Sequence, residues 1–180
     1  MRTARRPHGA AMRILGVDPG LNRTGYGLVE VSTQGPGLLE AGIIETDARS
    51  TLPNRLHELY GRFVGILSAG CPALIAIEDL FAHPRFPRTA IVMGHVCGVL
   101  HLAAAQAGIP IETIPPASAK RALVASGRAG KGQVQRMVRM LLALAEDPRT
   151  DVADALALAL VAVSRRGLPL GPSAPFRGSL

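Results

Sequence analysis

The stretch Arg13-Ile14-Leu15-Gly16-Val17-Asp18-Pro19-Gly20 decides how this chain folds. Its apolar run predicts a buried β-strand, and Asp-Pro-Gly is typical of the turn that ends a strand. Two further runs, residues 25–31 and 38–46, predict strands, with a turn at residues 34–37 between them. Because the connections are short, the three strands predict an antiparallel meander.

Beyond the meander, helical and strand patterns alternate along the chain. The remaining elements are expected as helices at 52–69, 89–107, 118–125, 131–144 and 150–164, and as strands at 73–77 and 109–114. The run at 73–77 is apolar throughout, as in a strand buried on both faces. A meander followed by β-α-β crossovers predicts an α/β fold in which helices flank a mixed five-stranded sheet.

Composition and charge favour a nucleic-acid partner. The 180 residues are 48% hydrophobic, which predicts a globular fold, and 20 basic residues outnumber 13 acidic ones for a net charge of +7. This balance favours a polyanion, with nucleic acid ahead of an anionic membrane and a genomic arginine bias as the alternative. Since aromatic residues make up 3%, a stacking platform for single strands is not expected.

The ends of the chain differ in composition from its middle. Residues 1–11 are expected to form a disordered basic arm, residues 12–166 a folded domain, and residues 167–180 a flexible tail rich in Pro, Gly and Ser. Cys71 and Cys97 form no CxxC pair and predict reduced thiols in a cytoplasmic protein. No apolar run reaches the ~18 residues of a membrane span, so no membrane partner is expected.

Four carboxylates lie where an apolar element meets a turn. Asp18 and Glu78 close two predicted strands, and Asp151 and Asp154 lie three residues apart at the start of the last helix. Residues at i and i+3 share a helix face. Four acids brought together would raise their own pKa values or bind cations.

Each acid also has a structural explanation that the residues alone leave open. Asp18 fits a strand-ending turn, Asp151 fits an N-cap or first-turn position, and Glu78 fits a strand exit. Successive strand residues point to opposite faces, so only one of Glu78 and Asp79 can face Asp18, and Glu78 is the prediction. Asp154 is the hardest to explain structurally, because its helix has little polar face.

The four acids predict a metal-dependent nuclease. An oxygen ligand set without Cys or clustered His favours Mg²⁺ or Mn²⁺ over Zn²⁺. Two such ions, roughly 3.5–4 Å apart, hold both the attacking water and the leaving oxygen when a phosphate backbone is cleaved. The basic balance of the chain is consistent with such a substrate.

Four motifs follow one another along the chain in a recognisable order. The motifs are Gly16-Val-Asp-Pro-Gly20 with Thr24-Gly-Tyr-Gly27, Ala76-Ile-Glu-Asp-Leu-Phe81, residues 127–138, and Asp151-Val-Ala-Asp-Ala-Leu-Ala157. In this ordered set the chain resembles the RuvC family of bacterial Holliday-junction resolvases, and the match spans about residues 12–165. The first motif alone is shared with other ribonuclease H-like and actin-like folds, whereas the ordered set is specific.

The resemblance implies an RNase H-like fold, a homodimer and a Mg²⁺-dependent endonuclease. Such an enzyme nicks opposed strands of a four-way DNA junction symmetrically in recombination and repair, and leaves 5′-phosphate and 3′-hydroxyl ends. It also implies a RuvA-RuvB branch-migration complex as a partner.

The resemblance assigns roles to individual residues as well. By motif position the metal ligands are Asp18, Glu78, Asp151 and Asp154, which would bind a pair of Mg²⁺ ions in each subunit, with Mn²⁺ as a substitute. Lys131 is expected as a further catalytic residue. The predicted DNA-contacting residues are Phe81, Arg85, Arg88, Lys120, Arg128 and Lys131.

The chain departs from the family pattern at a few positions. Pro84 and Pro87 stiffen the loop after Phe81, Cys97 replaces an arginine, and Gly130 replaces an acidic residue before Lys131. These changes keep a second hypothesis in play, namely a resolvase-like scaffold that binds junctions without cutting them. A third, from the Asp-Pro-Gly turn alone, is an actin-like phosphotransferase.

Overall fold

Five strands form one sheet in the order β3-β2-β1-β4-β5. The strands are β1 (Met12–Asp18), β2 (Arg23–Ser32), β3 (Gly35–Glu45), β4 (Leu74–Glu78) and β5 (Ile111–Ile114). β2 is antiparallel to both β1 and β3, whereas β4 is parallel to β1 and to β5. The predicted meander and the mixed five-stranded sheet are therefore confirmed.

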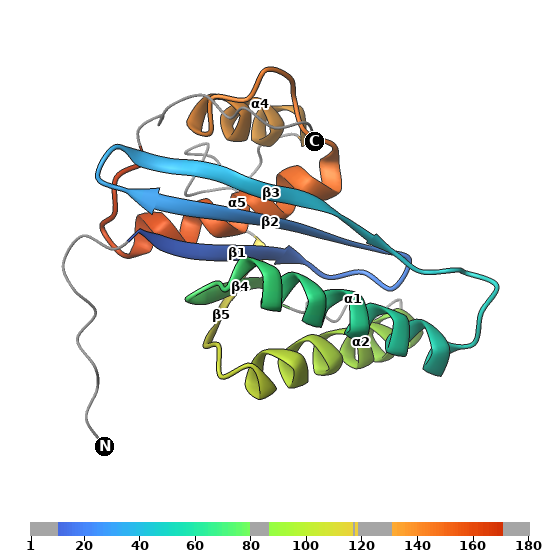
Figure 1. Ribbon diagram of the computed structural model, residues 1–180. Helices are drawn as coiled ribbons and strands as arrows, with labels where there is room; N and C mark the ends of the chain where they lie inside the picture. Colours follow the sequence, from blue (N-terminus) through green and yellow to red (C-terminus); the bar gives the residue numbers. More distant parts are fainter. Residues whose placement is uncertain (1–10, 80–86, 117, 119–130, 171–180) are drawn as a thin grey trace.

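Helices cover both faces of this sheet (Figure 1). The structure, a computed structural model, describes residues 11–79, 87–116, 118 and 131–170. The helices in these ranges are α1 (Leu52–Gly70), α2 (Pro87–Gln106), α4 (Lys131–Leu141) and α5 (Thr150–Arg165). α1 and α2 pack on one face, and α4 and α5 on the other. The helix predicted at 118–125 lies, apart from its first residue, outside the described residues.

Two predicted boundaries are wrong by three residues, for reasons of local backbone geometry. The β2–β3 hairpin reverses at residues 33–34, and Gly35 and Pro36 already pair with Ser32 and Val31, because Gly35 adopts a left-handed φ of 115°. The helix predicted at 131–144 ends at Leu141, where the chain turns through Ala143 at φ 50°.

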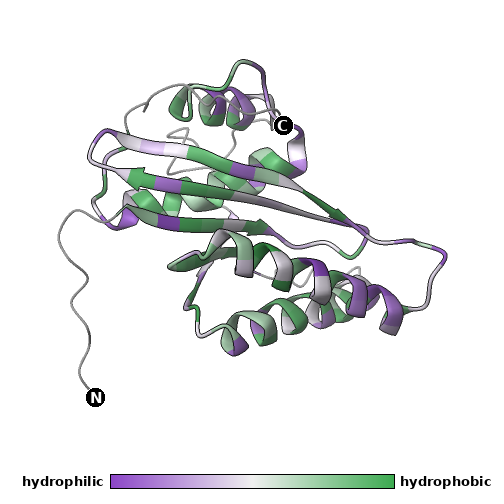
Figure 2. Ribbon diagram, viewed as in Figure 1, coloured by the Kyte–Doolittle hydropathy of each residue, from purple (hydrophilic) through white to green (hydrophobic). Residues whose placement is uncertain are grey.

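The sheet is buried on both faces because its side chains alternate. Ile14 packs with α4 and α5, and the next residue, Leu15, packs with α1 and α2. Figure 2 shows hydrophobic residues concentrated along the strands and along α5, with hydrophilic residues mainly on loops and outer surfaces. Leu168 and Leu170, within the predicted tail, also pack against the α5 side of the core.

Glycines on β1 and β2 let α5 lie unusually close to the sheet. A Cβ added to Gly16 would overlap the carbonyl oxygen of Ala155 and come within 2.9 Å of the Ala159 backbone nitrogen. A Cβ added to Gly25 would overlap the carbonyl oxygen of Asp151. Because these neighbours are backbone atoms, a rotamer change cannot relieve the overlap. The two glycines therefore set the depth at which α5 packs.

Helix α2 leaves an apolar stripe exposed. Ile91 and Leu102 are 62% and 54% exposed, and Gly94 and Gly98 have open space around them. We call the exposed residues Ile91, Gly94, Gly98, Leu102 and Ala105 the α2 stripe; their spacing of three and four residues places them on one face.

The same helix qualifies one prediction. Residues 88–106 are long and apolar enough to cross a membrane, contrary to the expectation that no segment would be. Length and composition alone are weak support for a span, since the core helix of a soluble protein or a signal sequence passes the same test.

The close approach of α5 gives the first testable prediction. Gly16→Ala should destabilise the protein by roughly 2–4 kcal/mol, because the helix must move away to admit the methyl group. Gly61→Ala in α1, where nothing lies within 4 Å, is the matched control and should stabilise by about 0.5–1 kcal/mol through helix propensity. Urea unfolding measures both. Equal effects of the two substitutions would contradict the packing argument.

Candidate active site

Asp18 and Glu78 lie side by side at one edge of the sheet. Val17 of β1 pairs with Ile77 of β4 in parallel register, so the next residue on each strand is an acid. Gly16 and Ala76, which lie two residues before these acids, face α5. Because side chains two apart on a strand point to the same face of the sheet, Asp18 and Glu78 also face α5. Asp79 is exposed. The structure thus places Glu78, as predicted, next to Asp18.

Helix α5 brings the other two acids to this edge. Asp151 lies in its first turn, after Arg149 at the N-cap, and Asp154 lies one turn further along. Both are half-buried, within a helix whose other residues from 152 to 163 are fully buried. The contact between the Asp151 carbonyl and Gly25, which pairs with Asp18 across β1 and β2, seats the start of α5 beside Asp18.

The electrostatics of Asp18 reflect this convergence. The pKa of Asp18 is raised from 3.8 to about 8, first by burial and then by the negative charges of Glu78, Asp154 and Asp151. A hydrogen bond between Asp18 and Glu78 raises the pKa further and requires one of the two carboxyls to hold a proton. In the metal-free protein this proton therefore neutralises part of the negative charge that a bound cation would neutralise.

The donor set suits a hard divalent cation. All four candidate ligands are carboxylates, and oxygen ligands are those that Mg²⁺ and Mn²⁺ prefer. Within the described ranges, no three His, Cys, Asp or Glu side chains already converge on one point as metal ligands. The residues thus fit a metal in chemistry and location, and cation binding would draw them together.

The remaining predicted site residues fall in different places. Phe81, Arg85, Lys120 and Arg128 lie outside the described residues, and Lys131 begins α4. Arg88 is exposed at the start of α2 and lines a groove of about 510 Å³. The opposite wall of that groove is formed by residues 20–23, immediately after Asp18.

Cavity size does not mark the site. A larger groove, of about 650 Å³, lies between the C-terminal ends of α1 and α2, where β4 and β5 begin. That is the opposite edge of the sheet from Asp18 and Glu78, and no acid lines it among the described residues. The chemistry is therefore located by the carboxylates.

Two residues near the site were missed in the sequence. Thr24 is fully buried and closes the β1–β2 connection, its hydroxyl donating to the Gly20 carbonyl at 2.7 Å and accepting from the Gly20 N–H at 3.2 Å. Arg55 is also buried, on α1. The burial of Arg55 could have been predicted from its i, i+4 spacing with Leu59 and Phe63, because this spacing places it on the core face of the helix.

Comparison with known proteins identifies related chains. A family model described as "Crossover junction endodeoxyribonuclease RuvC" matches residues 14–162. A protein of that description from Rhodopirellula baltica is 46% identical over 155 residues, which are 84% of this chain and 86% of its own.

Solved structures agree with the family model. The structure of Thermus thermophilus RuvC is 32% identical, with a TM-score of 0.78 over 87% of this chain and 98% of its own. T. thermophilus RuvC in complex with Holliday junction substrate is 31% identical, with a TM-score of 0.76 over 87% and 96% of the two chains.

The raised pKa of Asp18 predicts how stability depends on pH. The folded metal-free protein keeps a proton on Asp18 up to pH about 8, whereas the unfolded chain releases it near 3.8, so stability should fall as pH rises between these values. Asp18→Asn should remove much of this loss of stability, and should stabilise the metal-free protein at pH 9 by roughly 2 kcal/mol. This value is smaller than a full ~1.4 kcal/mol for each unit of pKa shift, because water and ions relieve part of the repulsion.

Thermal unfolding in EDTA at pH 5 and pH 9 measures this dependence. Asp79→Asn, which neutralises the exposed neighbouring acid, is the matched control and should keep the wild-type slope. The explanation fails if Asp18→Asn and Asp79→Asn change the slope equally.

Proposed function

Because this chain belongs to the RuvC family of crossover junction endodeoxyribonucleases, we propose that it resolves four-way (Holliday) DNA junctions by symmetric nicks in opposed strands. The observation that carries the proposal is the group of four acids at one edge of the sheet, around an Asp18 carboxyl whose pKa is raised to about 8. Acids so arranged are costly unless a cation and an anionic substrate complete the site. The fold is RNase H-like, and the chain is a nuclease.

The proposed reaction is hydrolysis of one phosphodiester in each nicked strand. Water attacks phosphorus in line, the bond from phosphorus to the 3′ oxygen breaks, the attacking water loses a proton and the leaving oxygen gains one. The products are a 5′-phosphate and a 3′-hydroxyl, which a ligase can seal. The chain contributes the fixed carboxylates and the basic surface that orient the strand.

Metal binding is proposed for Asp18, Glu78, Asp151 and Asp154. Mg²⁺, with Mn²⁺ as a substitute and about two ions per subunit, would when bound lower the pKa of water and stabilise the charge that develops on the leaving oxygen. The carboxylates come from three elements, β1, β4 and α5, so their mutual position is set by packing rather than by a flexible loop.

DNA binding is proposed along the side of the molecule that carries these acids. Arg88 lines the groove beside the β1–β2 connection and would contact a phosphate there. Phe81, Arg85, Lys120, Arg128 and Lys131 complete the proposed contacts on sequence grounds, with Lys131 also acting at the scissile phosphate. The net charge of +7 supports a salt-sensitive affinity.

We propose that two copies pair through the α2 stripe. Ile91 and Leu102 would otherwise leave apolar surface in water, and Gly94 and Gly98 would let two helices approach closely. A two-fold dimer also matches the two-fold symmetry of a junction with paired nicks. From its family we also propose that the protein is a cytoplasmic enzyme that works with a RuvA-RuvB branch-migration complex.

Nicking of a labelled, mobile four-way junction in Mg²⁺ tests the catalytic assignment. Asp154→Asn should lower the single-turnover nicking rate at least about 100-fold while junction binding is kept, since the residue is assigned to metal binding rather than DNA affinity. Asp79→Asn, the exposed acid beside Glu78, should cut within about twofold of wild type. Plain duplex serves as the substrate control.

Two results would count against the assignment. Wild-type cutting by Asp154→Asn would remove Asp154 from the site. Tight junction binding by the wild type, without nicking in Mg²⁺ or Mn²⁺, would favour the scaffold hypothesis.

Leu102→Glu tests the dimer. A glutamate at this position would bury an unpaired charge in the apolar interface, so the variant should be monomeric at micromolar concentration by light scattering. Met140→Glu places the same charge on α4, at a side chain 64% exposed, and should leave the dimer intact. A monomeric wild type, or a dimeric Leu102→Glu variant, would contradict the assignment.

A further inference from the structure

Arg55 is a buried cation behind the β1–β2 connection (residues 19–22). Its side chain is 8% exposed, and it continues the buried stripe of α1 formed by Leu59, Phe63 and Leu67. The position therefore belongs to the core by its helical spacing, yet it carries a guanidinium, which stays protonated in proteins.

Two physical effects make this placement costly. Burial removes water from the charge, and Arg55 follows directly on the first turn of α1, near the positive end of the helix dipole. Its hydrogen-bond acceptors among the described residues are neutral oxygens. The pKa of nearby Asp47 is lowered first by hydrogen bonds from Arg49, and the charge of Arg55 adds a smaller effect.

The guanidinium joins the β1–β2 connection to the end of the sheet. Nε donates to the Thr46 hydroxyl at 3.0 Å, and Nη2 donates to the Leu21 carbonyl at 3.1 Å and to the side-chain oxygen of Asn22. Thr46 adds bonds of its own, because its hydroxyl donates to the Leu21 carbonyl and its N–H donates to the Asn22 carbonyl at 3.2 Å. Arg55 and Thr46 together hold both residues.

The held residues form one wall of the groove that faces Arg88. Leu21 and Asn22 lie on the β1–β2 side of that groove, and Arg88 and Thr89 lie on the α2 side. Gly20 is held separately by Thr24, and Asp18 by its strand pairing. Loss of Arg55 would therefore remove one of the two anchors of Leu21 and Asn22 and loosen this wall, while leaving Asp18 in place.

We propose that Arg55 is a positioning residue that sets the shape of the DNA groove beside the active site, through Leu21 and Asn22. The inference rests on the proposed junction-cleaving function, since the groove is assigned to the DNA strand that continues from the cut phosphate. Arg55 contacts no substrate itself. Its role is to fix a wall on which the strand lies, so it acts on affinity rather than on the chemical step.

The test separates binding from chemistry. Arg55→Gln should raise the Kd for a four-way junction about 5- to 20-fold, while the single-turnover nicking rate at saturating protein stays within about threefold of wild type. Arg55→Lys should be nearly as defective, because one ammonium cannot span acceptors on two segments. Both variants are measured well below their unfolding temperatures, since a lower stability is expected whatever the role.

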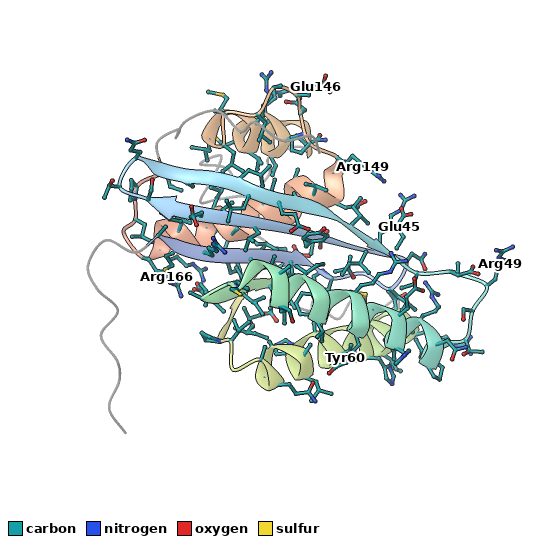
Figure 3. The ribbon with its side chains drawn as sticks, in the orientation of Figure 1. Glu45, Arg49, Tyr60, Glu146, Arg149 and Arg166 are labelled. Carbon is teal, nitrogen blue, oxygen red and sulfur yellow. The ribbon has the colours of Figure 1, made fainter. Side chains whose placement is uncertain are left out.

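Arg49→Gln is the matched control. Arg49 lies on the connection between β3 and α1 (residues 46–51), is 92% exposed, pairs with Asp47 and points away from the body of the molecule (Figure 3). Its loss removes the same charge without touching the groove wall, so the Kd should stay within about twofold of wild type. Thr46→Val should weaken binding in the same direction as Arg55→Gln, and the double variant should be less than additive.

The outcomes distinguish the inference from its premise. Wild-type Kd in Arg55→Gln, or full rescue by Arg55→Lys, would overturn the positioning role while the wild-type enzyme still cuts. An equal loss in Arg49→Gln would assign the effect to net charge instead. Failure of the wild type itself to bind or nick junctions would overturn the proposed function, on which the inference depends.

Discussion

The candidate active site depends on how closely α5 lies against β1 and β2. At Gly16 and Gly25 the strand backbone meets the carbonyl oxygens of Ala155 and Asp151, with no space for a Cβ between them. Contacts between backbone atoms are fixed by the main chain and do not adjust through rotamers. The depth and position of α5 are therefore set, and its first two turns arrive with Asp151 and Asp154 beside Asp18.

The same packing gathers like charges, which opposes folding. Burial and three neighbouring carboxylates raise the pKa of Asp18 to about 8, so the metal-free site keeps a proton that free aspartate would lose. The start of α5 offsets part of the repulsion through its dipole. A bound cation would relieve this repulsion, and in that way metal binding would add to the stability of the folded protein. The RuvC-family assignment gives that demand for a cation a catalytic use.

Individual residues show how far the sequence allowed prediction. Asp18 and Glu78 were located correctly because each follows an apolar run that can only be a buried strand, and alternation singled out Glu78 over Asp79. Arg55 was missed because its neighbours in the i, i+4 series suggest an apolar residue, and nothing local reveals the oxygens of Leu21, Asn22 and Thr46 that receive it. The β2–β3 turn was misplaced because a glycine-rich stretch permits reversal at several positions.

Local sequence was thus sufficient for the element types, the mixed sheet and the positions of the four acids at the ends of strands and the start of α5, because hydrophobic periodicity and turn residues act over a few positions. Long-range packing alone determined that the acids of α5 reach Asp18, that Arg55 is buried behind the β1–β2 connection, and that the α2 stripe is left exposed. These features join residues separated by tens of positions in the chain. Such contacts depend on how the helices pack on the sheet, and a local sequence pattern does not determine that packing.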